Sequence, residues 1–341
     1  MIKKKISIKD IAQLTGTSIT TVSFVLNGKG RISEPIKNKI LKVAKENGYE
    51  PNRMAVGLRT GYSKVIGLVV EEIGGEFFGA LAKVIEQEAE LAGYRIIYCS
   101  TNNNLEKGRD VIRMLSQQMV DGYIITPMKG LEHQIINLIE SGKPVVLIDG
   151  YYPDLDIPHV LVDNYKSAYN GVQHLVQAGY KNIGFVTVDL DLIQLEERLQ
   201  GFKDALSANE LKNDEKMIAK LPFGLDGPIA IKKIKAFIKH NKQIDAIFFA
   251  TNYLGILGLQ CMREMNLVIP QNLAVISFDN NIIFGLYPPG ITAIQQPTRD
   301  IAKSAIDLLF SQLRAEKHDI SKIKVLIPSE LIKRNSTLGK N

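Results

Sequence analysis

The chain has 341 residues, a formal net charge of +6 and 45% hydrophobic residues, an ordinary share for a globular protein. That length is enough for two or three domains with substantial cores. No apolar run is long enough to span a bilayer and no apolar signal core follows the N-terminus, so we expect a cytoplasmic protein with no membrane partner. The two cysteines, Cys99 and Cys261, lie in apolar settings and indicate buried thiols, which excludes a scaffold held by disulfides or metal.

The positive charge is concentrated at the N-terminal end. Residues 1–61 carry twelve Lys and Arg against four Asp and Glu, a net charge of +8, so the remaining 280 residues carry −2. A basic segment on a near-neutral body favours a polyanion as its partner. The alternative is a solvated basic surface without a partner.

Residues 7–27, SIKDIAQLTGTSITTVSFVLN, predict two short helices joined by a tight turn. Ser7 can cap the first helix, and Gly16 stands where the chain turns, because glycine takes positive φ without steric cost. Ser18 then caps the second helix, and Val22 fills the angle between the two. This spacing is the helix-turn-helix signature, in which the second helix enters a DNA major groove. An ordinary pair of core helices is the alternative, which the basic surroundings disfavour.

Two further helices are expected before residue 62. Ser33 is expected to cap the first, which ends at Gly48 and has an apolar stripe formed by Ile36, Ile40, Leu41 and Ala44. The second is short, starting after Pro51 and stopping at Gly61. Gly57 within it costs roughly 1 kcal/mol of helix propensity relative to alanine, so we expect it to be marginal alone and to form on binding. A plain linker is the alternative.

From Lys64 onward, apolar strand candidates alternate with helical patterns, which predicts parallel α/β units. Strands are expected at 65–70, 95–99, 122–126, 145–148, 159–162, 183–188, 246–250 and 274–278. Helices are expected at 78–92, 105–118, 165–178, 197–208, 228–239, 254–265 and 299–313. The strands are unbroken apolar runs, as expected when helices cover both faces of a sheet. The number of units suits two doubly wound lobes better than one.

Short motifs run in a fixed order through the whole chain. They are IKDIAQLTGTSITTVSFVLNG, GYEPNRMAVGLRTG, IGLVV with EFF, VDGYIIT, PVVLID, VDNYKSAY, ERLQGF, FFATN, VISFDN and PPGITAIQQP. In order and spacing they resemble the lactose- and galactose-repressor type (LacI/GalR) family of bacterial transcription regulators.

The resemblance implies an α/β protein: a small all-α helix-turn-helix head plus a two-lobed, Rossmann-like core of the periplasmic-binding-protein kind. The implied domains are a head at 1–50, a hinge helix and linker at 51–62, and an effector-binding and dimerisation core at 63–341. The N-lobe would comprise about 63–161 and 292–322, and the C-lobe about 163–290 and 324–341. The crossings between lobes would lie near Asp163, Ile291 and Ile323.

In function, the resemblance implies a homodimeric repressor and not an enzyme, with no cofactor and no metal. It would bind pseudo-palindromic double-stranded operator DNA under the control of a small effector. The implied DNA contacts are Ser18, Ile19, Thr20, Thr21, Ser23, Phe24 and Asn27 in the recognition helix, and Arg53, Ala55 and Leu58 in the hinge. Leu58 matches the family's minor-groove wedge, with a core leucine as the alternative. Phe24 departs from the family's usual arginine; it could contact a thymine methyl but cannot hydrogen-bond a guanine edge.

The implied effector site is a cleft between the lobes. Its residues by motif match are Phe77, Phe78, Asp163, Arg198, Asn252 and Asp279. Aromatic faces with a few fixed polar groups suit a sugar ring, although each polar residue could instead cap a helix or link the lobes. Tyr253 and Asn280 depart from the family pattern, and Glu71 and Glu72 stand at a strand end that faces the cleft. A sugar or sugar derivative is therefore the first expectation and a nucleobase the alternative.

Two other classes of protein are less consistent with the sequence. A cytoplasmic solute-binding protein with a vestigial head is disfavoured by the missing signal peptide and by the +8 head. An enzyme on a Rossmann-like core is disfavoured because no G-x-G-x-x-G follows a strand, no phosphate-binding loop motif is present and the five histidines are scattered. The short C-terminal tail has no heptad pattern, so a dimer is expected rather than a tetramer.

Overall fold

The computed structural model describes residues 6–49, 61–314 and 323–339. The chain divides into two compact units, Met1–Ser63 and Lys64–Asn341. The predicted hinge helix, with its contact residues Arg53, Ala55 and Leu58, lies outside the described residues. In the described ranges, no helix is long and apolar enough to cross a membrane.

In the described part of the first unit there are three short helices, α1 (Ile8–Thr15), α2 (Ile19–Leu26) and α3 (Glu34–Glu46). The predicted caps of the first two helices and the predicted turn between them are confirmed. Ser7 and Asp10 form a reciprocal capping box at α1, Gly16 takes φ +65°, and the Ser18 hydroxyl accepts from the backbone N–H of Thr21 at 3.0 Å. The buried core contains Ile11, Ala12, Val22, Val25, Ile40 and Ala44.

The prediction for α3 was partly wrong. Ser33 occupies the N-cap position, but its side chain makes no capping hydrogen bond. Ile40 and Ala44 are buried as expected, whereas Ile36 and Leu41 are 39% and 42% exposed. Three helices of this length enclose too little volume to bury a wider stripe, so the outer apolar positions of α3 stay at the surface.

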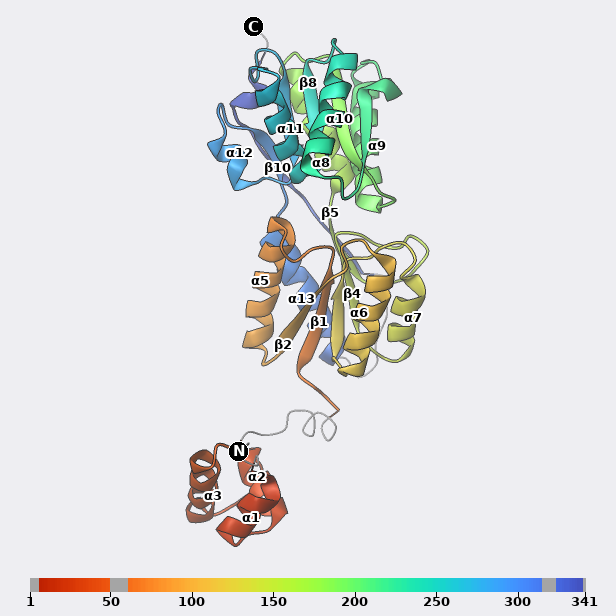
Figure 1. Ribbon diagram of the computed structural model, residues 1–341. Coiled ribbons are helices and arrows are strands. Elements are labelled where there is room, and N and C mark those ends of the chain that lie inside the picture. The colour runs from red at the N-terminus through yellow and green to blue at the C-terminus, as the bar shows by residue number, and fades with distance from the viewer. Residues whose placement is uncertain (1–5, 50–60, 315–322, 340–341) are drawn as a thin grey trace. The chain divides into compact units, whose positions relative to one another are not determined.

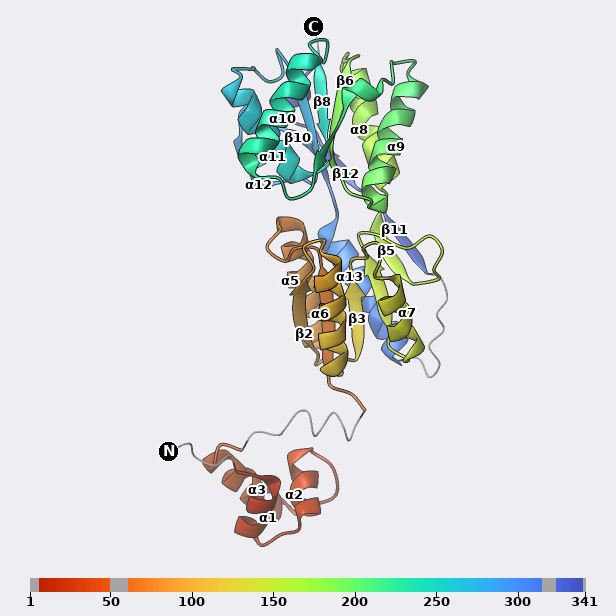
Figure 2. The same ribbon diagram turned by 45° about the vertical axis from the view of Figure 1, so that its right-hand side comes forward.

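The second unit contains two lobes, each with a six-stranded sheet between layers of helices (Figures 1 and 2). The N-lobe sheet is parallel throughout and runs in the order β11-β5-β4-β3-β1-β2. Its strands are β1 (Val65–Val70), β2 (Arg95–Ser100), β3 (Gly122–Ile125), β4 (Val145–Ile148), β5 (His159–Val162) and β11 (Lys324–Ile327). One face packs against α5 (Glu76–Leu91) and α13 (Thr298–Arg314), and the other against α6 (Leu105–Gln117) and α7 (Glu132–Glu140).

The C-lobe sheet runs in the order β12-β10-β9-β8-β6-β7, with only β12 antiparallel to its neighbour among the described strands. Its strands are β6 (Ile183–Asp189), β7 (Ile218–Pro222), β8 (Ala246–Phe249), β9 (Ala274–Phe278), β10 (Thr292–Gln295) and β12 (Glu330–Ile332). α8 (Asn164–Gln177) and α9 (Ile193–Ala208) cover one face; α10 (Gly227–His240), α11 (Asn252–Glu264) and α12 (Ile282–Leu286) cover the other. Two 3₁₀ turns, η1 (Glu215–Met217) and η2 (Asn335–Thr337), complete the lobe.

The predicted strands and helices of the core are all present, with ends shifted by a few residues. Strands β7, β10, β11 and β12 and helices α7 and α12 were not predicted. β7, β11 and β12 lie at sheet edges, where one side of the strand is open and polar residues interrupt the apolar run. Cys261 is buried as expected, whereas Cys99 is only partly buried.

The chain crosses between the lobes three times, and two of the predicted crossing points require correction. The first crossing lies at Asp163, between β5 and α8. The second comes after β10, because β10 still pairs with β9 of the C-lobe sheet. The third comes after β11, which pairs with β5 in the N-lobe. Residues 292–295 therefore belong to the C-lobe and 324–327 to the N-lobe, since strand pairing continues beyond Ile291 and Ile323.

Candidate functional site

The second helix of the head presents a mixed polar and apolar face. The predicted contact residues Ser18, Ile19, Thr20, Phe24 and Asn27 are exposed, and Thr21 and Ser23 are partly buried. Val22 and Val25 of the same helix lie in the core. All seven predicted positions of α2 are therefore at least partly accessible, while its opposite face fixes the helix against α1 and α3.

The Phe24 side chain is 42% exposed and its ring rests against the loop that follows α2. A Cβ added at Gly30, where φ is +80°, would lie 3.1 Å from Phe24 Cδ2. This close approach fixes one side of the ring and leaves the other side in solvent, which suits an apolar contact.

In the core, a cavity of about 160 Å³ lies between the two lobes. Its wall is built mainly from residues just beyond the carboxyl ends of strands: Glu71 and Glu72 after β1, Asp149 after β4, Asn252 after β8, Asp279 after β9 and Gln296 after β10. Ligands of open α/β sheets bind at this edge, because the strand-to-helix connections there leave room between the helices.

Five of the six residues predicted for the effector site line this cavity, namely Phe77, Phe78, Arg198, Asn252 and Asp279. The sixth, Asp163, is not in its wall. The Asp163 carboxylate accepts from the backbone N–H of Lys166 at 2.8 Å and caps α8. Asp163 lies at the first lobe crossing as expected, but its side chain caps the N-terminus of α8.

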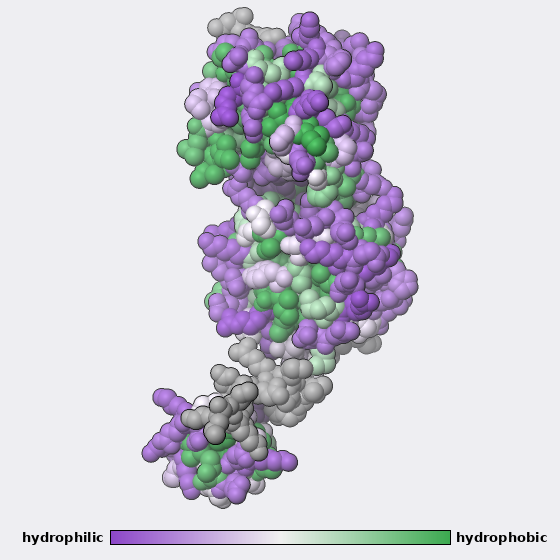
Figure 3. Space-filling view, viewed as in Figure 1, coloured by the Kyte–Doolittle hydropathy of each residue, from purple (hydrophilic) through white to green (hydrophobic). Residues whose placement is uncertain are grey.

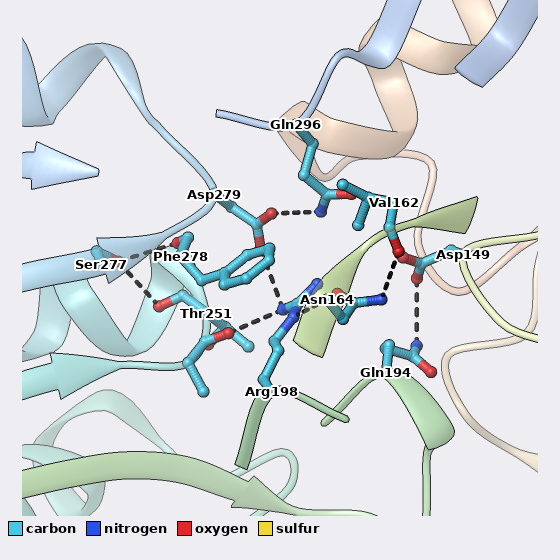
Figure 4. Close-up of polar contacts among 11 residues, drawn as sticks. Asp149, Val162, Asn164, Gln194, Arg198, Thr251, Ser277, Phe278, Asp279 and Gln296 are labelled. Carbon is cyan, nitrogen blue, oxygen red and sulfur yellow. Dashed lines mark hydrogen bonds and ion pairs between the residues drawn. The ribbon is translucent and has the colours of Figure 1, made fainter. Parts of the chain in front are cut away.

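Arg198 is the most constrained charged side chain of the wall and is only 3% exposed (Figure 4). Its Nε donates to Asn164 Oδ1 and its Nη1 to the carbonyl oxygen of Ala250, both at 2.8 Å. Nη1 also lies 3.7 Å from Asp279 Oδ2, and the guanidinium carbon stacks 3.6 Å from the centroid of the Phe278 ring. Hydrogen bonds, an ion pair and a cation–π contact thus fix this guanidinium.

A glycine one turn further along α9 makes this arrangement possible. A Cβ at Gly201 would lie 2.2 Å from the carbonyl oxygen of Tyr165 on α8, closer than atoms can approach. Only glycine therefore lets α9 cross α8 closely enough for Arg198 to reach Asn164 at the start of α8.

Asp149 faces the cavity from the N-lobe, and Gln194 Nε2 of the C-lobe donates to its Oδ2 at 3.2 Å (Figure 4). Burial raises the pKa of the Asp149 carboxyl to about 7. This value includes the opposing effect of the positive charge of Arg198, and the negative charges of Asp279 and Glu71 contribute to the rise. Burial also raises the pKa of Glu71, whose charge is repelled by Glu72.

Asp149, Gln194 and Gln296 were missed in the sequence. Asp149 had a usable signal: it ends the apolar strand β4 as Asp279 ends β9, and both residues have φ +63°. This left-handed backbone is accessible to Asp at little cost, and it turns the chain sharply at the strand end. Gln296 follows β10, which was not predicted, and Gln194 lies in the first turn of a helix that begins earlier than expected.

The fold and these two surfaces define a class of protein: a helix-turn-helix head joined to a two-lobed core with an interlobe ligand cavity. Residues 7–52 match the family of bacterial regulatory proteins called the lacI family, and residues 172–337 match a periplasmic-binding-protein-like domain.

Known proteins extend this likeness over the whole chain. The HTH-type transcriptional regulator RegA of Clostridium saccharobutylicum is 30% identical, over 97% of this chain and 99% of its own. The ribose operon repressor of Halalkalibacterium halodurans is 30% identical, over 98% and 97%. A crystal structure of the lac repressor dimer bound to operator and the anti-inducer ONPF superposes with a TM-score of 0.85 at 21% identity, covering 98% of this chain and all of that one.

The chain belongs to the lacI family of bacterial regulatory proteins. It is accordingly a DNA-binding transcription regulator and not an enzyme, as predicted. The predicted family and the predicted fold class, a helix-turn-helix head on a periplasmic-binding-protein-like core, are confirmed.

Proposed function

We propose that this protein is a cytoplasmic, homodimeric repressor whose affinity for a pseudo-palindromic operator is controlled by a sugar or sugar derivative. The observation that carries the proposal is the interlobe cavity, which combines aromatic side chains with fixed hydrogen-bonding groups. Phe77, Phe223 and Tyr253 offer apolar faces, and Asn252 and Asp279 offer polar atoms to ring hydroxyls. These groups come from both lobes, so a ligand that contacts them would favour one angle between the lobes over another.

The volume of the cavity suits a ligand with a single ring. An apolar cavity of about 150 Å³ holds benzene, so about 160 Å³ suits one hydroxylated ring rather than two. A nucleobase has a similar volume and is the second candidate, because the aromatic walls would also accept a flat ring. The hydroxyl-accepting carboxylate of Asp279 favours the sugar.

Bonds across the cavity suggest how the lobe angle is held. Gln194 donates to Asp149, and Asn281, just before α12, donates to Glu76 at the start of α5. Each pair joins one lobe to the other within or beside the wall. A ligand that replaced these partners would change the relative stability of the open and closed arrangements, which is the step that control by an effector requires.

For DNA binding, we expect Phe24→Ala to weaken operator affinity by roughly tenfold, the scale of one lost base contact. Operator fragments would be selected from random DNA with the full chain, and fluorescence anisotropy would be measured over a range of salt concentrations. The slope against salt should be unchanged, because Phe24 carries no charge. Leu14→Ala is the matched control, since Leu14 is 58% exposed on α1 and not on α2. Equal losses in both variants, or none in Phe24→Ala, would remove Phe24 from the interface.

For the dimer, the apolar surface of α12 is the proposed contact. Ile282, Ile283 and Leu286 are 72%, 41% and 75% exposed, and hydrophobic side chains gather over this helix at the left of the C-lobe (Figure 3). A contiguous patch of this kind on a folded protein indicates a protein interface. A second copy of the chain is its proposed occupant, because pseudo-palindromic operators require a two-fold partner.

We therefore expect Leu286→Glu to shift the full chain from dimer to monomer in sedimentation equilibrium at micromolar concentration. Operator affinity should fall with it by at least about tenfold, because the two half-sites are no longer bound by one particle. Leu91→Glu provides the control, since Leu91 is an 84% exposed leucine on α5, away from α12. A dimer that survives Leu286→Glu would place the interface elsewhere.

A further inference from the structure

The wall of the interlobe cavity is strongly acidic. Five carboxylates line it, from Glu71, Glu72, Glu76, Asp149 and Asp279. Among the residues that the structure describes, Arg198 is the one Lys or Arg in this wall. Because negative charges that face one cavity repel one another, their shared placement favours a compensating charge or a proton.

Arg198 does not supply that charge to the whole group. Its guanidinium is held by Asn164, Ala250 and Phe278, and its ion pair is with Asp279 at 3.7 Å. Within the described part of the chain, no ion pair joins a Lys or Arg to Glu71, Glu72, Glu76 or Asp149. The acidic wall therefore keeps a net negative charge around the cavity.

Gln296 provides an independent observation. Its side-chain Nε2 donates to Asp279 Oδ1 at 2.5 Å, which fixes the amide orientation because a carboxylate only accepts. Its Oε1 is then a second acceptor in the wall, and it has no hydrogen-bond partner among the described residues although Gln296 is only 4% exposed. A buried acceptor left without a donor costs about 1–3 kcal/mol in general, so its place in the wall indicates a ligand that donates.

A metal ion fits this wall poorly. Across the described ranges, no three His, Cys, Asp or Glu side chains are grouped closely enough to hold one. The carboxylates are instead spread around a volume that suits an organic ring.

We infer that the effector is an amino sugar, that is, a hydroxylated ring that carries a protonated amine. This inference rests on the proposed function. The ammonium group would be received by the acidic wall around Asp149 and Glu71, and the hydroxyls by Gln296 and Asp279. Figure 4 shows Asp149, Gln296 and Asp279 of this wall. An ammonium offers three donors and one positive charge, which match the acceptors and the net negative charge of this wall. The same wall would repel sugar phosphates and sugar acids, because each would add negative charge.

The electrostatics of Asp149 agree with this ligand. Its carboxyl has a pKa of about 7, raised by burial and by Asp279 and Glu71 against the opposing charge of Arg198. An ammonium beside it would favour the charged form and lower that pKa, so binding at neutral pH would release a proton. A neutral sugar would leave this equilibrium almost unchanged.

The test compares glucosamine, galactosamine and mannosamine with their parent hexoses, their N-acetyl forms and the hexose 6-phosphates. Calorimetry on the full chain at pH 7, in two buffers of different ionisation enthalpy, gives affinity and proton release together. We expect at least one amino sugar to bind tenfold or more tightly than its parent hexose and its N-acetyl form, with proton release. Equal or tighter binding of a parent hexose, an N-acetyl form, a phosphate or a nucleobase would overturn the inference, as would failure of all amino sugars to bind.

Variants separate this inference from the proposed function. Asp149→Asn and Glu71→Gln should each remove most of the preference for the amine, whereas Asp307→Asn, an exposed carboxylate on α13 away from the cavity, should retain it. Retention of the preference in both cavity variants would overturn the inference. If a neutral sugar binds more tightly than the amino sugars and alters operator affinity, the inferred amine is wrong and the proposed function stands. If no sugar or nucleobase alters operator affinity, both the inference and the proposed function are wrong.

Discussion

Replacing Arg198 with alanine should lower the free energy of unfolding of the ligand-free protein by about 3–5 kcal/mol, the usual effect of removing one partner of a buried ion pair. Arg198 is only 3% exposed and donates hydrogen bonds to Asn164 and to the carbonyl oxygen of Ala250. Without it, Asn164 Oδ1 and the Ala250 carbonyl lose their donor, and the carboxylate of Asp279 loses its nearby positive charge. Urea unfolding of the full chain, followed by circular dichroism at neutral pH, measures the change.

A second substitution distinguishes the charge from the packing. In the double variant Arg198→Ala with Asp279→Asn, part of the loss should be recovered, because the carboxylate left without its partner is then neutral. Lys129→Ala is the exposed control: Lys129 pairs with Asp191 across the lobes, but its side chain is 75% exposed, so a much smaller change is expected. Equal losses for Arg198→Ala and Lys129→Ala would contradict the buried role of the arginine.

The same variant bears on ligand control. Because Arg198 lines the cavity and orders Asn164 and Asp279 beside it, Arg198→Ala should abolish the response of operator binding to ligand. The head has its own buried core in a separate compact unit, so its fold does not depend on this residue. An unchanged ligand affinity in Arg198→Ala would remove this residue from the site.

Local chemistry explains what the sequence could predict. The capping residues Ser7 and Ser18 and the turn at Gly16 act within a few residues of their own positions, so their pattern is visible along the chain. Central strands such as β1 and β4 are apolar because helices cover both of their faces. The edge strands β7, β11 and β12 are less continuous in apolar sequence than these central strands, and their placement depends on pairing with one distant neighbour.

The same reasoning separates the site residues that could be predicted from those that could not. Asp279 and Asp149 both lie in quoted motifs and share a strand-end position and a φ of +63°, yet only Asp279 was assigned to the site. Gln296 acquires its role from Asp279, a contact 17 positions away in sequence. Asp163 was expected to face the ligand, yet an Asp three residues before a backbone N–H is also the ordinary cap of a helix, and that role prevailed.

Asp149→Asn should stabilise the ligand-free protein at pH 8 and have progressively less effect as the pH falls toward 4. The Asp149 pKa is about 7 in the folded protein against an ordinary value of 3.8. Between these values the unfolded chain ionises while the folded protein keeps its proton, so folding loses stability as the pH rises through this window and the loss levels off above pH 7. The shift corresponds to an effect on the order of 2–4 kcal/mol at pH 8.

The substitution isolates this charge, because asparagine has the shape of the protonated carboxyl and tolerates the φ of +63° at this position. The groups that set the pKa, namely Arg198, Asp279, Glu71 and Gln194, remain in place, so the difference between variant and parent reports on Asp149 alone. Unfolding free energies would be measured at pH 5 and pH 8 without ligand, with the exposed Asp307→Asn as a control expected to change little. Equal destabilisation by Asp149→Asn at both pH values would instead mean that the carboxylate is ionised throughout and held by Arg198. A gain at pH 8 would mean that the ligand-free cavity stores unfavourable charge, which a cationic ligand can relieve on binding.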